Sequence, residues 1–107
     1  MTKKILIADD EQNIVISLEF LMKREGFEVL VANDGEEAAR RIRSEHPDLV
    51  LLDVMMPKKS GFEVCQEIKA DPAMAAVRIL MLTAKGRDTE VAKGLALGAD
   101  AYMTKPF

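Results

Sequence analysis

The sequence predicts one α/β domain with an open, doubly wound parallel sheet of five strands. Two observations lead to this fold class. Short β-rich runs alternate with segments of helical period along the whole chain, and two of the β-rich runs are continuously apolar. In Ile5–Ile7 and Leu49–Leu52 no polar residue alternates with an apolar one, which is typical of strands buried on both faces of a parallel sheet. The helices that connect such strands cover both faces of the sheet.

The elements are expected in strict strand–helix order. The predicted strands are Lys4–Ala8, Glu28–Ala32, Leu49–Asp53, Arg78–Thr83 and Ala101–Met103. The predicted helices are Gln12–Arg24, Gly35–Ser44, Gly61–Ala70 and Asp88–Leu97.

Several helix ends carry their own signals. Asp34 and Ser60 each precede a predicted helix and are followed three residues later by a glutamate, which is the spacing of a capping box. Gly26 and Gly98 come just after predicted helices, where a residue in the left-handed conformation is favoured. These signals support the helix boundaries independently of the apolar periodicity.

Composition and charge exclude several classes of function. The 107 residues are expected to form one domain, 1–107, and 49% of them are hydrophobic. With a net charge of −3 and no basic stripe, the chain is not expected to bind nucleic acid, and Arg40, Arg41 and Arg43 are interpreted as a solvated helix face. No apolar run approaches the roughly 20 residues of a membrane span. Cys65 is the only cysteine, which excludes an internal disulfide, favours a core position and fits a reducing, cytoplasmic location.

Charged and hydroxyl side chains gather where the predicted strands end. They are Asp9, Asp10 and Glu11 after the first strand, Asp53 in the third, Thr83 in the fourth and Lys105 after the fifth. In open α/β sheets, ligands bind at the carboxyl ends of the strands. Neighbouring carboxylates repel each other by roughly 1 to 4 kcal/mol per pair at about 4 Å. We therefore expect a cation to bind at this edge of the sheet.

The donor set suits Mg²⁺, which takes one or two carboxylates and keeps several waters. With the ion bound, one aspartate can act as a nucleophile toward a phosphoryl group. Asp53 is the candidate, because it ends the most apolar strand and precedes a loop that can leave it exposed. The Lys105 ammonium and the Thr83 hydroxyl are groups that stabilise charge on the transferred oxygens.

Short motifs along the entire chain resemble the receiver domain of two-component response regulators. They are Ile7–Glu11 (IADDE), Leu52–Pro57 (LDVMMP), Ser60–Glu63 (SGFE), Leu82–Ala84 (LTA), Gly98–Tyr102 (GADAY) and Lys105–Phe107 (KPF). Each motif is weak alone, but together they stand in the order and spacing of the family. The resemblance implies the flavodoxin-like receiver fold, with strand order 2-1-3-4-5.

The resemblance also implies a set of ligands. Asp53 would accept a phosphoryl group from a histidine kinase or a histidine phosphotransfer protein. Asp10 and Asp53 would ligate Mg²⁺ directly, Asp9 would act largely through water, and Met55 would supply its backbone carbonyl.

Further roles are implied for the residues of a switch. Lys105 would contact the phosphoryl oxygens, Thr83 would turn toward the phosphoryl group, and Tyr102 would change rotamer in response. The output stays open between a stand-alone receiver that presents a face to a partner protein and a regulator with a downstream effector domain.

Receiver domains normally continue into a fifth helix beyond their Lys-Pro-Phe motif. At Phe107 the chain is therefore expected to stop before that helix, as a fragment or as a deliberately shortened chain. An apolar patch would then be exposed, and the oligomeric state is left open.

Two other functions compete with the receiver. A hydrolase of the haloacid dehalogenase type needs a second acid two residues after its nucleophilic aspartate, and that position is Met55. A flavodoxin-like cofactor binder needs a loop of backbone donors after the first strand, where this chain has Asp9, Asp10 and Glu11. We therefore expect a signalling domain that catalyses its own phosphorylation and dephosphorylation without turning over an external substrate.

Overall fold

Five parallel strands form one sheet in the order β2-β1-β3-β4-β5. The computed structural model describes residues 3–84 and 88–105 of the chain. The strands are β1 (Lys4–Ala8), β2 (Glu28–Ala32), β3 (Leu49–Asp53), β4 (Arg78–Ala84) and β5 (Ala101–Lys105). The helices are α1 (Gln12–Arg24), α2 (Gly35–Glu45), α3 (Gly61–Lys69) and α4 (Asp88–Ala96), with a 3-10 turn, η1, at Pro72–Met74. The predicted fold class and strand order are confirmed.

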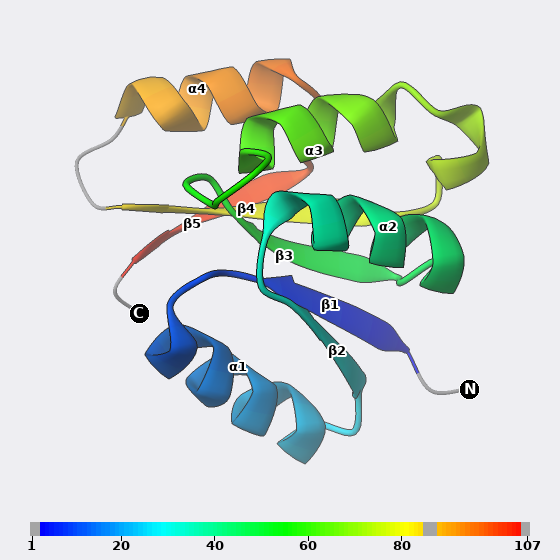
Figure 1. Cartoon of the computed structure of the whole chain (residues 1–107), viewed down its shortest axis with the longest axis vertical. Coiled ribbons are helices and arrows are strands. Elements are labelled where there is room, and N and C mark those ends of the chain that lie inside the picture. Colours follow the sequence, from blue (N-terminus) through cyan, green and yellow to red (C-terminus); the bar gives the residue numbers. More distant parts are fainter. Residues whose placement is uncertain (1–2, 85–87, 106–107) are drawn as a thin grey trace.

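Helices lie on both faces of the sheet, with α2, α3 and α4 on one face and α1 on the other (Figure 1). Successive side chains of a strand point to opposite faces, so Leu51 joins the apolar cluster under α1 and Leu52 joins the cluster under α2 and α3. Both residues are buried. The continuous apolar runs in the sequence therefore correspond to strands that contribute side chains to two cores.

The two predicted capping boxes differ in the structure. The box at the start of α3 is complete, because Ser60 Oγ accepts from the Glu63 N–H and Glu63 Oε1 accepts from the Ser60 N–H. At the start of α2, Asp34 Oδ1 accepts from the Glu37 N–H at 2.8 Å, whereas Glu37 Oε1 accepts from the N–H of Asn33, one residue earlier than the box requires. The cap of α2 still satisfies two backbone donors.

The chain turns sharply where helix ends were predicted. Gly26 and Gly98 have φ of 92° and 107°, as expected for left-handed residues after a helix. His46, just before Pro47, has φ of 48° and ends α2 by donating its N–H to the Ile42 carbonyl. The turn η1 is not predicted, because three residues are too few to show a helical period.

Two further expectations from the sequence are confirmed. Cys65 is fully buried in the core, and burial raises the pKa of its thiol, so the group is a packing residue at neutral pH. Arg40 and Arg43 are exposed, as expected for a solvated helix face, and Arg43 also pairs with Glu67 of α3 at 3.2 Å, which was not predicted. Among the described residues, no helix is both long enough and apolar enough to cross a membrane.

A polar network ties the amino ends of β4 and β5 together, at the sheet edge opposite the predicted site. The Asp100 carboxylate accepts from Lys69 Nζ at 2.8 Å, from the Ile79 N–H at 2.8 Å and from Arg78 at 3.3 Å. Burial raises the pKa of the Asp100 carboxyl, but these donors outweigh that effect and leave the pKa below its ordinary value. The network therefore stabilises the fold only while Asp100 is ionised.

We predict that Asp100→Asn lowers the free energy of unfolding by about 1 kcal/mol at pH 7, because a charge-assisted interaction with Lys69 is lost. The carboxyl pKa is lower in the folded chain than in the unfolded chain, so the stabilisation is present above the unfolded pKa and is lost as the pH falls through the folded pKa. Urea unfolding of both proteins between pH 7 and pH 2 should show the gap narrowing below about pH 4. A gap that stays constant down to pH 2 would contradict the role of the charge.

Candidate functional site

The sheet register brings the first and third strands to the same level at their carboxyl ends. Ala8 of β1 pairs with Leu52 of β3, so the residues that follow them, Asp9 and Asp53, lie side by side. On the other side of β3, Asp53 pairs with Leu82 of β4, which places Thr83 one residue beyond this level. Parallel pairing therefore assembles residues that are far apart in the sequence.

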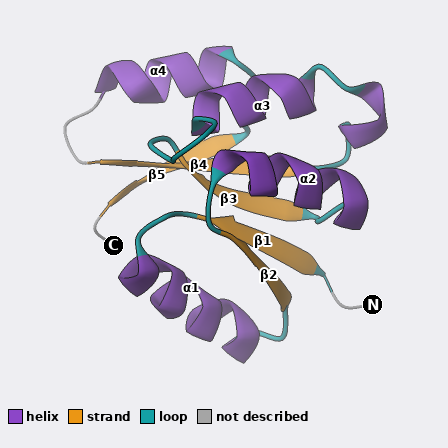
Figure 2. Ribbon diagram, in the orientation of Figure 1, coloured by secondary structure: helices purple, strands orange, loops and turns teal. Residues whose placement is uncertain are grey.

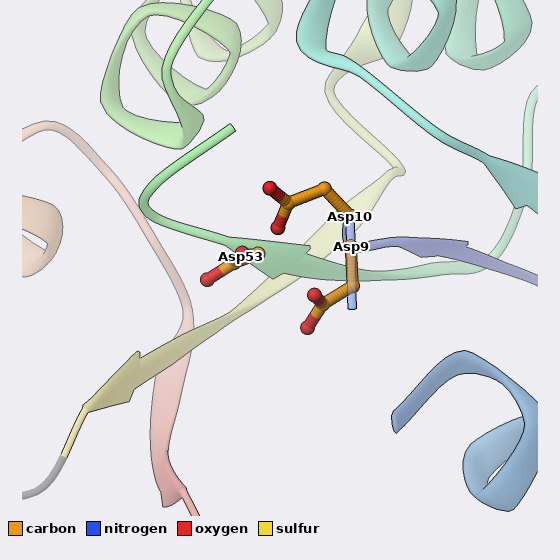
Figure 3. Close-up of side chains that lie close together, drawn as sticks. All are labelled: Asp9, Asp10 and Asp53. Carbon is orange, nitrogen blue, oxygen red and sulfur yellow. The ribbon is translucent and has the colours of Figure 1, made fainter. Parts of the chain in front are cut away.

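Three carboxylates meet at this edge. Asp9, Asp10 and Asp53 each offer an oxygen within 4.8 Å of the others, and Figure 3 shows the three groups around a common space in front of β3. Asp9 is fully buried and Asp53 is 5% exposed, whereas Asp10 is exposed. The predicted acidic cluster is thus present, with one solvent-facing member and two enclosed ones.

The turn after β1 determines how the first two aspartates point. Asp9 Oδ1 accepts from the Glu11 N–H at 2.8 Å, which folds the chain tightly before α1 begins. The Glu11 carbonyl then accepts from the N–H groups of Ile14 and Val15. This local hydrogen bonding leaves Asp10 on the outer side of the turn with its carboxylate in the cluster (Figure 3).

Asp53 is more enclosed than the sequence suggested. A Cβ atom on Gly61 would overlap the Asp53 carbonyl oxygen, and the Gly61 N–H donates to the Val54 carbonyl at 2.9 Å. The start of α3 therefore folds back directly against the end of β3. From its place in the sequence Gly61 was predicted only to begin a helix, although a glycine immediately after the Ser60 cap is also a signal of close backbone approach.

The chemistry of the cluster fits a hard divalent cation. Carboxylate oxygens are the ligands that Mg²⁺ and related ions prefer, and a cation relieves the mutual repulsion of the three groups. The exposed Asp10 leaves one side open to water, which Mg²⁺ retains in its coordination shell. Asp9, Asp10 and Asp53 are therefore the residues that could hold a metal.

Thr83 lies beside the cluster with its side chain 1% exposed. Within residues 3–84 and 88–105, no hydrogen-bond partner reaches Thr83 Oγ1. A buried hydroxyl without a partner costs free energy unless a ligand or a rotamer change satisfies it. This atom can donate to an acceptor that enters the site.

For the remaining predicted site residues, Lys105, Tyr102 and Met55, the structure gives a position in the chain but describes no contact with the cluster. Lys105 ends β5 and pairs with Ala84 in the register, but the structure does not describe its side chain or residues 106–107. Tyr102 is half-exposed on β5 opposite Met81, and the side chain of Met55 is 66% exposed in the loop after Asp53. Lys105 and Tyr102 thus have a described strand position, and their proposed roles stay predictions.

One contact at the edge of the site was not found from the sequence. The Gly35 N–H at the start of α2 donates to the Pro57 carbonyl in the loop after β3, at 3.3 Å. Asp34, which was predicted only as a helix cap, also has a carboxylate oxygen 3.8 Å from Lys58 Nζ. The pKa of Asp34 is lowered first by the Glu37 N–H and further by Lys58.

Comparison with known proteins identifies the class to which this fold and site belong. The chain matches the response regulator receiver domain family over residues 5–107. It is 50% identical over 107 residues to the alkaline phosphatase synthesis transcriptional regulatory protein PhoP of Bacillus subtilis (strain 168), a match that covers 100% of this chain and 44% of that protein.

Solved structures of response regulators have the same fold as this chain. The chemotaxis response regulator CheY4 of Vibrio cholerae superposes with a TM-score of 0.93 at 31% identity, covering 100% of this chain and 89% of that one. The N-terminal domain of a response regulator receiver protein from Methanoculleus marisnigri JR1 has a TM-score of 0.85 at 38% identity, covering 96% and 84%.

The chain therefore belongs to the response regulator receiver domain family, the signal-transduction domains of two-component systems. It is a signalling domain rather than a turnover enzyme. The chain spans less than half the length of the PhoP relative.

The repulsion within the cluster gives a direct prediction for the metal-free protein. Asp10→Asn removes one charge from an exposed position without changing side-chain volume, so we expect the free energy of unfolding to rise by about 1 kcal/mol in EDTA at low salt. The gain should shrink in about 1 M salt, where the Debye length is near 3 Å. Urea unfolding of Asp10→Asn and of the wild type measures this gain at low salt and at high salt. A destabilised Asp10→Asn protein under metal-free conditions would show that the cluster is not under repulsion.

Proposed function

We propose that this receiver domain accepts a phosphoryl group on Asp53, in a Mg²⁺-dependent transfer from a phosphohistidine donor. The observation that carries the proposal is the meeting of Asp9, Asp10 and Asp53 within 4.8 Å at the carboxyl edge of the sheet. Beside them lies the buried Thr83 hydroxyl, for which the described part of the chain offers no hydrogen-bond partner. A nucleophilic carboxylate, a site for a cation and a hydrogen-bond donor are the parts that phosphoryl transfer needs.

The reacting step assigns one role to each residue. A carboxylate oxygen of Asp53 attacks the phosphorus of phosphohistidine, forming a P–O bond as the P–N bond breaks. The electron pair of the broken bond stays on the imidazole nitrogen of the donor, which then takes up a proton. The Thr83 hydroxyl and the Lys105 ammonium donate to the phosphoryl oxygens as charge develops on them.

For the metal ligands we propose the set that the resemblance to receiver domains implies. Asp10 and Asp53 are proposed to bind Mg²⁺ directly, Asp9 largely through water, and Met55 through its backbone carbonyl. When bound, Mg²⁺ neutralises the carboxylates and the phosphoryl oxygens, so that two anions can approach each other. Asp9, which is fully buried, keeps its position through its bond from the Glu11 N–H.

The signal is proposed to pass from Thr83 to Tyr102. Thr83 lies level with Thr104 in the register, two residues beyond Tyr102 on the neighbouring strand. If Thr83 turns toward a phosphoryl group, it vacates space near β4 that the half-exposed Tyr102 ring can fill. Such coupling between two sites is typically about 1 to 3 kcal/mol.

The partners follow from this reaction. The donor is a histidine kinase or a histidine phosphotransfer protein, and the output is a downstream effector domain or a partner protein. A cytoplasmic location fits the single buried, reduced Cys65. The domain itself is proposed to bind neither nucleic acid nor membrane.

We predict that incubation with Mg²⁺ and a small phosphodonor labels Asp53 with one acid-stable, base-labile phosphoryl group. Asp53→Asn should abolish the label, because an amide is not a competent nucleophile in this reaction. Asp71→Asn, which keeps a capping oxygen before η1 outside the cluster, is the matched control and should label normally. Intact-mass spectrometry and peptide mapping measure the label. A label that persists in Asp53→Asn on another residue would refute the choice of acceptor.

We also predict that Thr83→Ala still accepts the phosphoryl group but loses most of the structural response at Tyr102. Thr83→Ser keeps the hydroxyl and should respond as the wild type does. The measurement is the change in amide chemical shifts of β5 on adding beryllofluoride, a mimic of the phosphoryl group. Equal shifts around Tyr102 in Thr83→Ala and in the wild type would contradict the coupling.

A further inference from the structure

The loop between β3 and α3, residues 54–60, carries the backbone that flanks Asp53, and it is fixed at its base by two hydrogen bonds. The Val54 N–H donates to the Leu82 carbonyl of β4 at 3.3 Å, and the Gly61 N–H donates to the Val54 carbonyl at 2.9 Å. These bonds hold Val54, the first residue of the loop, and Gly61, the residue that follows it. They do not by themselves fix its far end at Pro57 and Lys58.

The far end of the loop rests on the turn between β2 and α2. The Gly35 N–H donates to the Pro57 carbonyl at 3.3 Å, and the Cα of Gly35 is packed so closely that a Cβ there would overlap the Lys59 carbonyl oxygen. Figure 2 shows this loop beside the start of α2. Both contacts involve backbone atoms, which cannot move aside as the end of a flexible side chain can.

Lys58 shows that the loop conformation is imposed by its surroundings. Its φ is 70°, in the left-handed region that a residue with a side chain adopts at a cost. The Lys59 N–H donates to the Pro57 carbonyl at 2.8 Å, which closes the tight turn around Lys58. Asp34, fixed as the N-cap of α2, lies 3.8 Å from Lys58 Nζ and favours the same arrangement.

We propose that Gly35, assisted by Asp34, is a positioning residue for the site: the turn before α2 holds the loop after Asp53 in the geometry that binds the metal ion. The inference rests on the proposed function, in which the Met55 carbonyl of this loop is a metal ligand. A side chain at position 35 would push the Lys59 carbonyl away and shift the loop that carries Met55. Neither Gly35 nor Asp34 needs to touch the metal or the phosphoryl group.

The test compares Gly35→Ala with Gly26→Ala. Gly26 has φ of 92° and no atom within 4 Å of an added Cβ, so its substitution introduces backbone strain in the turn between α1 and β2 without touching the loop. The melting temperatures of both variants are measured, so that their Mg²⁺ affinities can be compared with the loss of stability of each taken into account. We expect the Mg²⁺ dissociation constant, measured by amide shift titration, to rise about tenfold in Gly35→Ala. It should stay within twofold of wild type in Gly26→Ala.

A second readout does not depend on metal or phosphoryl chemistry. In the metal-free proteins, Gly35→Ala should shift the amide resonances of Val54, Met55 and Met56, and Gly26→Ala should leave them in place. Unshifted loop amides together with an unchanged Mg²⁺ affinity in Gly35→Ala would overturn the proposal. Shifted loop amides in a protein whose Asp53 is never labelled would support the positioning role and refute the proposed phosphoacceptor.

If Gly35→Ala does not fold, the wild type alone provides the test. Coupling between sites is reciprocal, so saturation with Mg²⁺ should slow hydrogen exchange of the Gly35 amide several-fold. The Gly98 amide, which donates to the Leu95 carbonyl, is the internal control, and its exchange rate should be the same with and without Mg²⁺. An unchanged Gly35 exchange rate would contradict the proposal.

Discussion

Repulsion among three carboxylates at the ends of two central strands is the constraint on which this edge of the molecule depends. At separations of at most 4.8 Å, a pair of full charges repels by roughly 1 to 4 kcal/mol, and the lower end of this range applies to pairs with the exposed Asp10. The whole fold of an ordinary domain is stable by only about 5 to 15 kcal/mol. Parallel pairing of β1 with β3 forces Asp9 and Asp53 to the same level, so the repulsion is built into the sheet itself. A cation bound among the three carboxylates relieves their repulsion, so the stability of the fold should depend on the concentration of that cation.

The amino ends of the strands, at the opposite end of the sheet, have a favourable arrangement of charges. There Asp100 is surrounded by donors from Lys69, Arg78 and the Ile79 backbone, and the charges attract. Between the two edges lie the apolar clusters that hold the strands in register. The ion pairs of Asp100 thus lie at the amino ends of β4 and β5, and the cluster of three carboxylates lies at the carboxyl ends of the strands, where a cation can bind it. Backbone contacts at Gly35 and Gly61 shape that responsive end without adding charge.

Much of this was predictable from the sequence, for physical reasons. The apolar runs predict β1 and β3, and the rule that ligands bind at the carboxyl ends of parallel strands groups Asp9, Asp10 and Asp53 from the sequence alone. The strand order came from the resemblance to receiver domains, because periodicity alone does not say which strands are neighbours. The enclosure of Asp53 was not predicted, although Gly61 is a sequence signal for it, and the contact of Gly35 with the loop was not predictable, since it joins backbone atoms of segments far apart in the sequence. The ends of β4 and β5 were each predicted too early, because Ala84 is small and Thr104 and Lys105 are polar, so none of them distinguishes strand from loop.

The most direct test of the account is the free energy of unfolding as a function of Mg²⁺ concentration at constant ionic strength. Binding to the folded state alone should raise that free energy by about 1.4 kcal/mol for each tenfold increase in Mg²⁺ above the dissociation constant. In Asp10→Asn the rise should be largely lost, and Asp71→Asn should follow the wild type. A wild-type stability that does not change with Mg²⁺ beyond the effect of an equal ionic strength of NaCl would contradict the claim that this acidic edge is a cation site.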